Sequence, residues 1–466
     1  MKAVGIDIGT TTICGVLLDG GTGELLDSRT LSNDTAVRTE NDWEHLQDPE
    51  KILEKCRRIL EAFQDGEEDI VSVGVTGQMH GILYTDVGGR AVSPLYTWQD
   101  RRGDLPCRES RDGKEETWAG ELSQKTGYPA ASGFGLVTHY YHVKNGTVPR
   151  EAVSLCTIPD YIAMSLAGEK RPLMHQSMAA SLGLYDLKGS CFDQRAMEEA
   201  GMDPGILPEV TREHRIVGRL KESAGEGNQS GTCVVSVALG DNQASFLGSV
   251  GPEERLLLNV GTGSQISAYT DRLIETGEAE CRPYLGETWL IAGSPLCGGY
   301  AYSLLKRFVE EIFEMEGTAP AHSIYELLNR WAGDVYEQKK REVQVDTRFN
   351  GSRKDPGLTG GIFGLTEESF HLGQFALGTL KGICEDLYRY YREFPREVRE
   401  STGIVGSGNG IRMNPLLQKI CNERFGKEMK IPRYSEEAGY GTALFSLLAG
   451  GYYRSLKEVQ ARIRYE

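Results

Sequence analysis

The stretch AVGIDIGTTTICGVLL, residues 3–18, decides how the rest of the chain is interpreted. An apolar run ends in Asp7, a turn of one glycine and three threonines follows at 9–12, and a second apolar run leads to an Asp-Gly-Gly turn. This pattern predicts a strand, a tight polar turn and a returning strand. The glycine lets the backbone approach a ligand, and the threonine hydroxyl and amide groups donate hydrogen bonds. The turn therefore suits a polyphosphate, and the same residues also suit an ordinary hairpin.

A second copy of this plan lies far along the chain. Residues 256–260 form an apolar run, the turn Gly-Thr-Gly-Ser follows, and residues 265–269 return as the second strand. Two halves that each open with a phosphate-type hairpin predict a duplicated α/β fold with a nucleotide clamped between the halves. A Gly-Pro-Glu-Glu break at 251–254 predicts a boundary between an N-terminal domain, 1–250, and a C-terminal domain, 251–466.

The length and the charge of the chain limit the classes of function. A chain of 466 residues suits two large domains better than one. Its formal net charge of −16 argues against nucleic acid or an anionic membrane as a partner. No apolar run reaches the length of a membrane span. An ATP site in so acidic a chain must gather positive potential locally, from backbone amides, helix N-termini and Mg²⁺.

The cysteines and the first residues predict a cytoplasmic protein. No two of the ten cysteines lie within four residues of each other, so neither a CxxC redox pair nor a zinc-ribbon spacing is present. Reduced thiols in a reducing compartment are the simplest explanation. The opening residues, MKAVGIDIG, lead directly into a strand and do not resemble a signal peptide.

The remaining elements follow a pattern that is typical of an α/β protein. Asp48 and Pro49 predict the N-cap and the first residue of a helix that packs one face on a core. Further helices are expected over 301–314 and 373–394, and a last helix, over 440–448, is expected to be amphipathic.

Two aspartates that follow apolar strands are candidates for phosphoryl-transfer chemistry. The chain has neither a GxxxxGKS nor a GxxxxGKT run, so it is not a P-loop enzyme. Asp241 follows the expected strand 234–239 and begins a helix, where it is placed to take the proton from a hydroxyl that attacks a γ-phosphate. An aspartate at such a turn is also a common helix N-cap, and both roles can hold together. Asp7, at the end of the first strand, is placed to hold Mg²⁺ through water.

A second group of polar side chains suits a polyhydroxyl substrate. The segments TGQMHG and TWQDRR follow neighbouring strands, so we expect both to face one crevice beyond the strand ends. Trp98 offers a flat face to a sugar carbon chain. Donors and acceptors for hydroxyl groups come from Gln78, His80 and Asp100.

Each of these side chains also has a structural explanation. His80 alone is more often a structural histidine, and Trp98 alone is more often a core aromatic. The Arg101–Arg102 pair also fits a solvated run of charge. The residues by themselves leave these alternatives open.

Taken together and in this order, the motifs resemble those of the FGGY carbohydrate kinases, which belong to the actin/hexokinase/Hsp70 superfamily. They are GIDIGTTT, VTGQMHG, TWQDRR, LGDNQASFLG, NVGTGSQ, GGIFGL and the glycine-rich loop that begins at Gly406. Within the family the chain is most similar to the sedoheptulokinases, on the basis of GFG at Phe134, TWQDRR at Trp98 and the Arg412-x-Asn414 pattern after the Gly406 loop. The resemblance implies two ribonuclease-H-like α/β domains with a deep cleft between them, and ATP with Mg²⁺ as phosphoryl donor.

The resemblance also implies roles for particular residues. Asp241 matches the family's catalytic aspartate, and Asp7 matches the acidic group near magnesium. The residues expected to bind the sugar are Gln78, Met79, His80, Trp98, Asp100 and Asn242. The residues expected to bind ATP are Thr10, Thr11, Thr12, Gly261, Thr262, Gly298, Gly299, Gly406, Gly408 and Asn409.

The chain departs from the family pattern in three places. Cys14 stands where the family usually has a lysine or arginine, so another cation must take over any contact of that residue with phosphate. His139 stands where a lysine is usual, and the segment after GGIFGL is shorter than the usual pattern. These departures concern the nucleotide contacts more than the activity.

We therefore expect an ATP-dependent kinase that phosphorylates a primary hydroxyl of a ketose, sedoheptulose first and D-xylulose second. A xylulokinase or another FGGY sugar or polyol kinase is the alternative within the family. A nucleotide-switched, actin-like ATPase without sugar chemistry is the alternative from another class, and Asp241 disfavours a catalytically dead regulatory homologue. The expected partner is a small-molecule sugar, and formation of a homodimer stays open.

Overall fold

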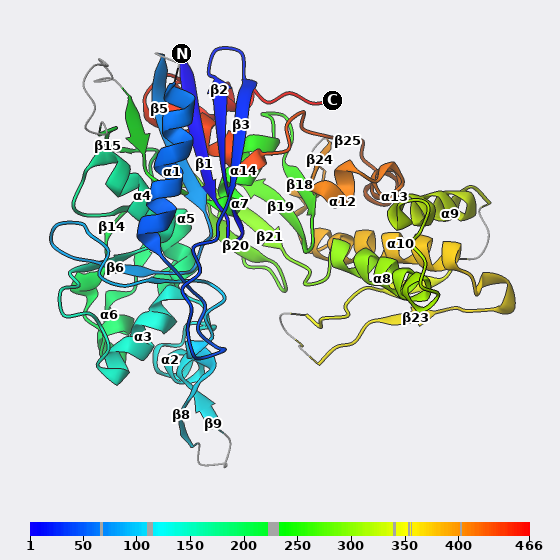
Figure 1. Ribbon diagram of the computed structural model, residues 1–466, viewed down its shortest axis with the longest axis horizontal. Coiled ribbons are helices and arrows are strands. Elements are labelled where there is room, and N and C mark those ends of the chain that lie inside the picture. The colour runs from blue at the N-terminus through cyan, green and yellow to red at the C-terminus, as the bar shows by residue number, and fades with distance from the viewer. Residues whose placement is uncertain are drawn as a thin grey trace. The chain divides into compact units, whose positions relative to one another are not determined.

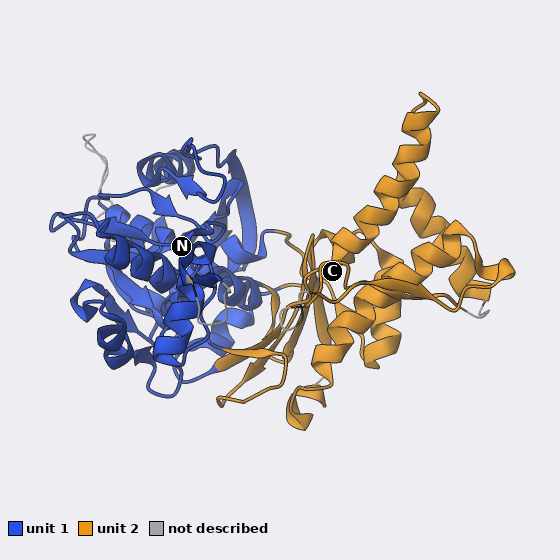
Figure 2. Ribbon diagram, turned by 90° about the horizontal axis from the view of Figure 1, so that it is seen from below, with its two compact units in different colours: residues 1–248, 282–288, 436–463 blue, residues 249–281, 289–435, 464–466 orange. Residues whose placement is uncertain are grey.

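The computed structural model describes residues 1–466 except 66–68, 110–114, 222–232, 339–341, 353–354, 356 and 401–402. The chain divides into two compact units, which Figure 2 shows in different colours. Unit 1 contains residues 1–248, 282–288 and 436–463, and unit 2 contains residues 249–281, 289–435 and 464–466. In the part of the chain that the structure describes, no helix is long and apolar enough to cross a membrane.

Unit 1 is built on a mixed sheet with the strand order β15-β16-β5-β1-β2-β3, in which β17 also pairs with β5. β1 runs antiparallel to β2 and parallel to β5. The strands of this part of the chain are β1 (Lys2–Ile8), β2 (Thr12–Asp19), β3 (Glu24–Ser32), β4 (Leu46–Gln47), β5 (Ile70–Gly77), β6 (Leu83–Thr85), β7 (Leu95–Tyr96), β8 (Pro106–Glu109), β9 (Glu115–Thr117), β10 (Ser154–Cys156), β11 (Leu173–His175), β12 (Tyr185–Asp186), β13 (Cys191–Phe192), β14 (Glu209–Thr211), β15 (Ile216–Arg219), β16 (Val234–Ser236) and β17 (Leu239–Gly240).

The following helices belong to unit 1, and of these α1, α4 and α14 pack on its main sheet. They are α1 (Pro49–Gln64), α2 (Trp118–Thr126), α3 (Gly135–Asn145), α4 (Ile158–Ala167), α5 (Gln176–Ala179), α6 (Gln194–Ala200), α7 (Asp241–Ser249), α14 (Glu437–Ala449) and α15 (Leu456–Gln460). The predicted start of α1 is confirmed, because the Asp48 side chain accepts hydrogen bonds from the backbone N–H groups of Glu50 and Lys51.

The predicted amphipathic character of the last long helix is wrong. In α14 every residue from Gly439 to Leu448 is buried, so the helix has no solvated face. It packs directly on the first sheet, where a Cβ atom on Gly5 would lie 1.9 Å from the carbonyl oxygen of Gly439. A Cβ on Gly74 would lie 2.1 Å from the carbonyl oxygen of Thr442, so glycine is required at both strand positions. The end of the chain thus becomes a central element of unit 1.

Unit 2 repeats the plan of unit 1 in its sheet, whose order is β20-β21-β19-β18-β24-β25. β18 and β19 form an antiparallel hairpin, and β18 runs parallel to β24, as β1 does to β5. The strands are β18 (Leu256–Val260), β19 (Ser264–Thr270), β20 (Glu280–Pro283), β21 (Trp289–Gly293), β22 (Gln344–Asp346), β23 (Gly361–Phe363), β24 (Ile404–Ser407) and β25 (Met429–Lys430). The helices are α8 (Gly299–Met315), α9 (Ile324–Gln338), α10 (Leu372–Tyr391), α11 (Arg396–Arg399), α12 (Asn409–Arg412) and α13 (Pro415–Phe425).

The matching strand orders confirm the predicted duplicated α/β fold. In each sheet an antiparallel hairpin is followed, on the side of its first strand, by a parallel strand (Figure 1). The apolar faces of the two sheets lie in separate hydrophobic cores. Each of the ten cysteines is a free thiol, and most are buried in these cores.

Candidate functional site

Three strands of unit 1 bring the two predicted aspartates to one edge of the first sheet. The predicted strand 234–239 is in fact two short strands, β16 and β17, because Ala238 leaves the ladder to form a bridge with Met174. In the register, Asp7 on β1 lies beside Thr76 on β5, and Gly240 on β17 lies beside Gly77. Asp241 follows Gly240 directly. The carboxyl ends of β1, β5 and β17 therefore carry Asp7, the TGQMHG segment and Asp241.

Asp7 lies in an unusually acidic environment. Burial, followed by the charges of Asp241 and Glu436, raises the pKa of Asp7 to about 7. Glu436 directly precedes α14, the helix that packs on β1, and sequence reasoning missed it. Asp7 and Glu436 come from opposite ends of the chain, so no local motif could have joined them. A buried carboxylate beside two others is stabilised by a proton or by a cation.

Asp241 is the first residue of α7, so its carboxylate lies at the positive end of the helix dipole. The backbone N–H of Asn242 donates a hydrogen bond to Oδ1 of Asp241 at 2.5 Å. Burial raises the pKa of Asp241, while this hydrogen bond and the positive charge of Arg282 oppose the shift. Arg282 is a second residue that sequence reasoning missed. Asp241 therefore begins α7, and its role in proton transfer stays a prediction.

The turn between β1 and β2 is held in place by three side chains from elsewhere in unit 1. Asn33 donates through Nδ2 to the carbonyl oxygen of Gly9 at 2.7 Å, and Gln47 donates through Nε2 to that of Thr10 at 3.0 Å. The indole Nε1 of Trp98 donates to Oγ1 of Thr10 at 3.0 Å. Thr11 and Thr12 are exposed. The turn is therefore fixed from one side and open on the other.

Cys14 contacts the carboxylate of Glu436 through an uncharged thiol, whereas a lysine or arginine at this position would bring a positive charge. It lies opposite Asp7 in the β1–β2 ladder, and its thiol donates to Oε2 of Glu436 at 3.3 Å. Burial and the neighbouring Glu436 and Asp7 charges help to raise the pKa of the thiol to about 12, so the residue is not a thiolate. Asp7, Asp241 and Glu436, which we call the acidic edge, thus receive no compensating positive charge from Cys14.

The segment after β5, which contains Met79 and His80, has an unusual backbone conformation. His80 has φ 71°, in the left-handed region that is uncommon for a non-glycine residue. Its Nδ1 donates to the carbonyl oxygen of Ser181 at 2.7 Å. The ring also stacks on Phe134, with centroids 5.0 Å apart and planes 5° from parallel. Met79 is buried next to Gly240.

Gln78 is buried with one polar atom left over. Its Nε2 donates to Oε1 of Gln47 at 2.8 Å, and Gln47 in turn holds the β1–β2 turn. The Oε1 atom of Gln78 has no hydrogen-bond partner within the described residues. A buried carbonyl oxygen without a partner is unfavourable and fits a position that a ligand donor completes.

Trp98 is not a core aromatic, because 47% of its surface is exposed. Its indole nitrogen is fixed by Thr10, which leaves the ring itself as an exposed, oriented face. The residue expected to face the sugar therefore touches the turn expected to face phosphate. An exposed aromatic whose polar atom is already bonded suits stacking on an apolar face of a ligand.

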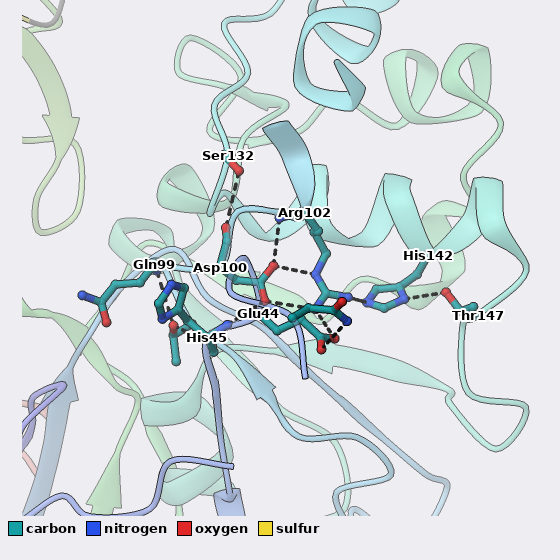
Figure 3. A network of polar contacts seen from close by, with 10 residues as sticks. Glu44, His45, Gln99, Asp100, Arg102, Ser132, His142 and Thr147 are labelled. Atoms are coloured by element: carbon teal, nitrogen blue, oxygen red, sulfur yellow. Dashed lines mark hydrogen bonds and ion pairs between the residues drawn. The ribbon is translucent and has the colours of Figure 1, made fainter. Parts of the chain in front are cut away.

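Asp100 and Arg102 form a buried ion pair, so the interpretation of Arg102 as part of a solvated charge run is wrong (Figure 3). Arg102 is 2% exposed and Asp100 is fully buried. Nε of Arg102 donates to Oδ1 of Asp100 at 2.6 Å, and its NH2 group donates to Oδ2 at 3.0 Å. The backbone N–H of His45 also donates to Oδ2, at 3.2 Å. Asp100 therefore fixes the loop that carries Trp98, and its sugar contact stays a prediction.

The rest of this network satisfies the Arg102 guanidinium. Its NH1 group lies 2.8 Å from Nε2 of His142, whose Nδ1 lies 2.7 Å from Oγ1 of Thr147. Burial, with the charges of Arg102 and His139, lowers the pKa of His142 to about 3, so its ring is neutral and Nε2 accepts from Arg102. The guanidinium carbon also lies 4.3 Å from the ring centroid of Tyr96.

In unit 2 three glycine-containing loops meet at the carboxyl end of β18. The backbone N–H of Gly299 donates to the carbonyl oxygen of Gly261, and that of Tyr300 donates to Thr262, both at 2.9 Å. A Cβ on Gly298 would lie 2.3 Å from the backbone of Gly263. Each contact joins the loop before α8 to the β18–β19 turn, so the two loops are built as one surface.

The third loop, after β24, joins the same place. Gly408 has φ 78°, and a Cβ there would lie 2.6 Å from the carbonyl oxygen of Val260. Asn409 follows it as the first residue of α12. Gly406 lies within β24, where a Cβ would lie 2.4 Å from Sδ of Met429, so packing requires a glycine there and its nucleotide contact stays a prediction.

The described residues contain no group of three histidine, cysteine, aspartate or glutamate side chains that is arranged to hold a metal ion. A divalent cation near Asp7 would therefore take most of its ligands from water and from a bound substrate. Mg²⁺ typically uses one or two carboxylates together with waters and phosphate oxygens. The surroundings of Asp7 fit that mode of binding.

Comparison with known proteins identifies both halves of the chain. Residues 2–248 match the N-terminal domain model of the FGGY family of carbohydrate kinases, and residues 256–450 match its C-terminal domain model. The chain is 25% identical over 486 aligned residues to sedoheptulokinase from Mus musculus, covering 95% of this chain and 97% of that protein. It is 22% identical to xylulose kinase from Staphylococcus epidermidis, covering 99% of this chain and 91% of that protein.

The fold has close counterparts among solved structures. The gluconate kinase from Lactobacillus acidophilus superimposes with a TM-score of 0.82 and 18% sequence identity, covering 100% of this chain and 92% of that one. The family members compared above thus differ in the substrate from which each takes its name.

Proposed function

This chain belongs to the FGGY family of carbohydrate kinases, and on that premise we propose that it transfers the γ-phosphoryl group of ATP to a primary hydroxyl of a ketose. Sedoheptulose is the first candidate, because similarity to sedoheptulokinases extends over nearly the full length of both chains. D-Xylulose is the second candidate, because xylulose kinases also match over nearly the whole chain. Family membership makes an actin-like switch without sugar chemistry a poor explanation.

One observation carries the proposal: Asp7, the threonine turn and Asp241 share an edge of one sheet with the segment that holds His80. Phosphoryl transfer needs a base next to the attacking hydroxyl and a cation next to the phosphates. Asp241 and Asp7 supply the two carboxylates for these tasks. Trp98, fixed on Thr10, offers the flat surface that a sugar chain requires.

Asp241 acts as the general base in this proposal. Its carboxylate accepts the proton of the primary hydroxyl as the oxygen attacks the γ-phosphorus, and the Asn242 N–H together with the helix dipole keeps that carboxylate oriented. The His80 ring and the Oε1 atom of Gln78, which has no hydrogen-bond partner among the described residues, are suited to hydrogen bonds with sugar hydroxyls. Met79 and Asn242 complete the sugar side.

Asp7 is the proposed protein group for Mg²⁺, held through water. When bound, the ion neutralises the phosphate charge and lowers the cost of the carboxylates at this edge. Thr10, Thr11 and Thr12 donate to phosphate oxygens, which is consistent with the open side of the β1–β2 turn. In unit 2 the loops containing Gly261, Thr262, Gly298, Gly299, Gly408 and Asn409 are the proposed nucleotide-binding surface.

A coupled assay of ADP release tests the proposal. The panel contains sedoheptulose, D-xylulose, L-ribulose, L-rhamnulose, L-fuculose, glycerol and gluconate, each with Mg-ATP and each against a blank without sugar. We expect sedoheptulose to give the highest kcat/KM and D-xylulose the next. If no sugar accelerates ADP release above the blank, the protein is not a kinase for this class of substrate.

A further inference from the structure

A short segment of the second half of the chain belongs to unit 1. Residues 282–288, which begin with the last two residues of β20, are grouped with unit 1, although the chain on both sides of them, 249–281 and 289–435, belongs to unit 2. The segment also lies inside the stretch that matches the C-terminal family model. Sequence order alone would assign it to the other half.

The contacts of this segment fasten it to α7 and to its neighbour α5. Nε2 of Gln243, two residues after Asp241, donates to the carbonyl oxygen of Pro283 at 2.9 Å. The rings of Phe246 and Tyr284 pack edge to face, with centroids 5.7 Å apart. Gln176, at the start of α5, donates through Nε2 to the carbonyl oxygen of Gly286 at 2.8 Å. Buried glutamines and an aromatic pair thus hold the segment against the helix that begins with Asp241.

These contacts fix the position of Arg282. It directly precedes Pro283, which is bonded to the first turn of α7, and its side chain is partly buried. The positive charge of Arg282 opposes the rise that burial causes in the pKa of Asp241. The pKa of Asp7 is raised by burial and by the negative charges of Asp241 and Glu436. The bond to Pro283 therefore places the backbone of Arg282 next to the first turn of α7, the helix that begins with Asp241.

We propose that Arg282 is a substrate-binding residue, which donates hydrogen bonds to the ketose oxygen next to the hydroxyl that is phosphorylated. The proposal rests on the kinase function proposed above. A hydroxyl that gives its proton to Asp241 brings its neighbouring oxygen within reach of a group beside Asp241. A guanidinium has five N–H donors and no acceptor, so it complements the accepting carboxylate. Together the two side chains recognise a pair of adjacent sugar oxygens.

The role also predicts specificity. A residue that donates a hydrogen bond to a substrate oxygen discriminates against an analogue without that oxygen, because the analogue cannot form this hydrogen bond. Removing the guanidinium should remove this discrimination. A merely structural arginine would not distinguish a ketose from its deoxy analogue.

The test uses Arg282→Met and Arg282→Lys, with Arg212→Met as the matched control. Arg212 forms an ion pair at 3.7 Å with Glu287, at the other end of the same segment, and is half-exposed. The substrates are the best ketose of the panel and its analogue that lacks the hydroxyl next to the phosphorylated carbon. KM for ketose, KM for ATP, kcat and the thermal midpoint are measured for each variant.

We expect Arg282→Met to raise KM for the ketose about 10- to 100-fold, the range for losing a hydrogen bond to a charged group. KM for ATP and the thermal midpoint should stay close to those of the unmodified protein, and kcat should fall less than about 10-fold. Arg282→Lys should recover part of the ketose affinity, and Arg212→Met should behave as the unmodified protein. The preference for the ketose over its deoxy analogue should shrink only in the Arg282 variants.

Three results would overturn the proposal. An unchanged KM for the ketose would show that Arg282 does not touch it. A fall in kcat alone would assign the residue to the transferred phosphoryl group, and a parallel rise in both KM values with a lower thermal midpoint would assign it to structure. Any of these with an active unmodified protein leaves the kinase proposal intact, whereas an unmodified protein without sugar-dependent ADP release removes both.

Discussion

The hairpins β1–β2 and β18–β19 share one plan and present different chemistry. Asp7 on β1 lies beside Thr76 of the parallel strand β5, and the corresponding residue on β18, Asn259, lies beside Ser407 of β24. Asn259 is an uncharged amide, and its Nδ2 donates to Oγ of Ser407 at 2.9 Å. Asp7 instead lies near two other carboxylates. The same strand position therefore carries an ionisable carboxyl group in one unit and an amide with an internal hydrogen bond in the other.

The surroundings of the hairpins follow the same division. The first is flanked by side chains that can act chemically, namely Asp241, His80 and Trp98. The second is flanked by glycine loops that pack backbone against backbone, such as Gly298 on Gly263. In a duplicated fold, one copy can thus carry the groups for proton transfer and cation binding. The other copy can let a ligand approach the backbone closely, which suits a flat or anionic ligand.

The largest expected effect follows from removing the base of the acidic edge. Asp241→Ala should lower kcat about 10²- to 10⁴-fold, since general-base catalysis contributes an amount of this order. The coupled ADP-release assay with the best ketose measures it. Asp104→Ala, at an exposed aspartate of unit 1, is the control and should retain full turnover. Undiminished turnover in Asp241→Ala would remove the base assignment.

Adding a side chain to the glycine loops of unit 2 should weaken binding of the nucleotide. Gly298→Ala places a Cβ about 2.3 Å from the backbone of Gly263, so one of the two loops must move. We expect KM for ATP to rise about 10- to 100-fold, corresponding to the 1–3 kcal/mol typical of overpacking, with little change in KM for the ketose. Gly333→Ala on α9 is the control, because its Cβ would meet nothing within 4 Å. Equal losses for both substrates would contradict the division between the units.

Making the second hairpin resemble the first should weaken nucleotide binding. Asn259→Asp introduces the carboxylate that the first hairpin has at this strand position, and phosphate oxygens nearby would be repelled. We expect affinity for ADP to fall about 5- to 10-fold, because two like charges about 4 Å apart repel by roughly 1 kcal/mol when water surrounds them. Titration calorimetry measures it, and an unchanged affinity would show that this strand end does not face phosphate.

The acidic edge should also be visible in the pH dependence of stability without magnesium. Because folding raises the pKa of Asp7 to about 7, the folded state holds this proton more tightly than the unfolded state. The resulting stabilisation is complete below the usual pKa of an aspartate and is lost as the pH rises through about 7. Asp7→Asn should therefore gain stability relative to the unmodified protein between pH 4 and 8, on the order of 1–3 kcal/mol.

Denaturant unfolding of both proteins at several pH values in magnesium-free buffer measures this difference. Added Mg²⁺ with nucleotide should reduce it, because a cation replaces the proton at Asp7. A difference that is independent of pH would mean that Asp7 does not titrate in the folded protein.

The sequence predicted what depends on local pattern. Both hairpins, the capped start of α1 and the helix that begins at Asp241 follow from residues close together in the chain. It did not predict α9 (Ile324–Gln338), nor the complete burial of α14, which depends on the glycine contacts that let this helix lie directly on β1. Hydrophobic spacing cannot reveal such contacts.

The site was predictable to a similar extent. Asp7 and Asp241 each follow an apolar strand, which is a local signal. Glu436 and Arg282 reach the same edge from remote segments, and their neighbours in sequence carry no motif that would indicate it. Arg102 lies in a run of charged residues, which usually indicates a solvated surface. It is nevertheless buried, because it pairs with Asp100 and packs on the ring of Tyr96. Tertiary packing, which one sequence does not display, decides these positions.

The most direct measurement of the division between the two hairpins is the affinity for ADP of Asp241→Ala and Gly298→Ala, determined by titration calorimetry at the same Mg²⁺ concentration. Asp241→Ala should bind ADP within about threefold of the unmodified protein while its turnover is lost, and Gly298→Ala should bind it about 10- to 100-fold more weakly. Loss of ADP binding in Asp241→Ala, or unchanged binding in Gly298→Ala, would contradict the account.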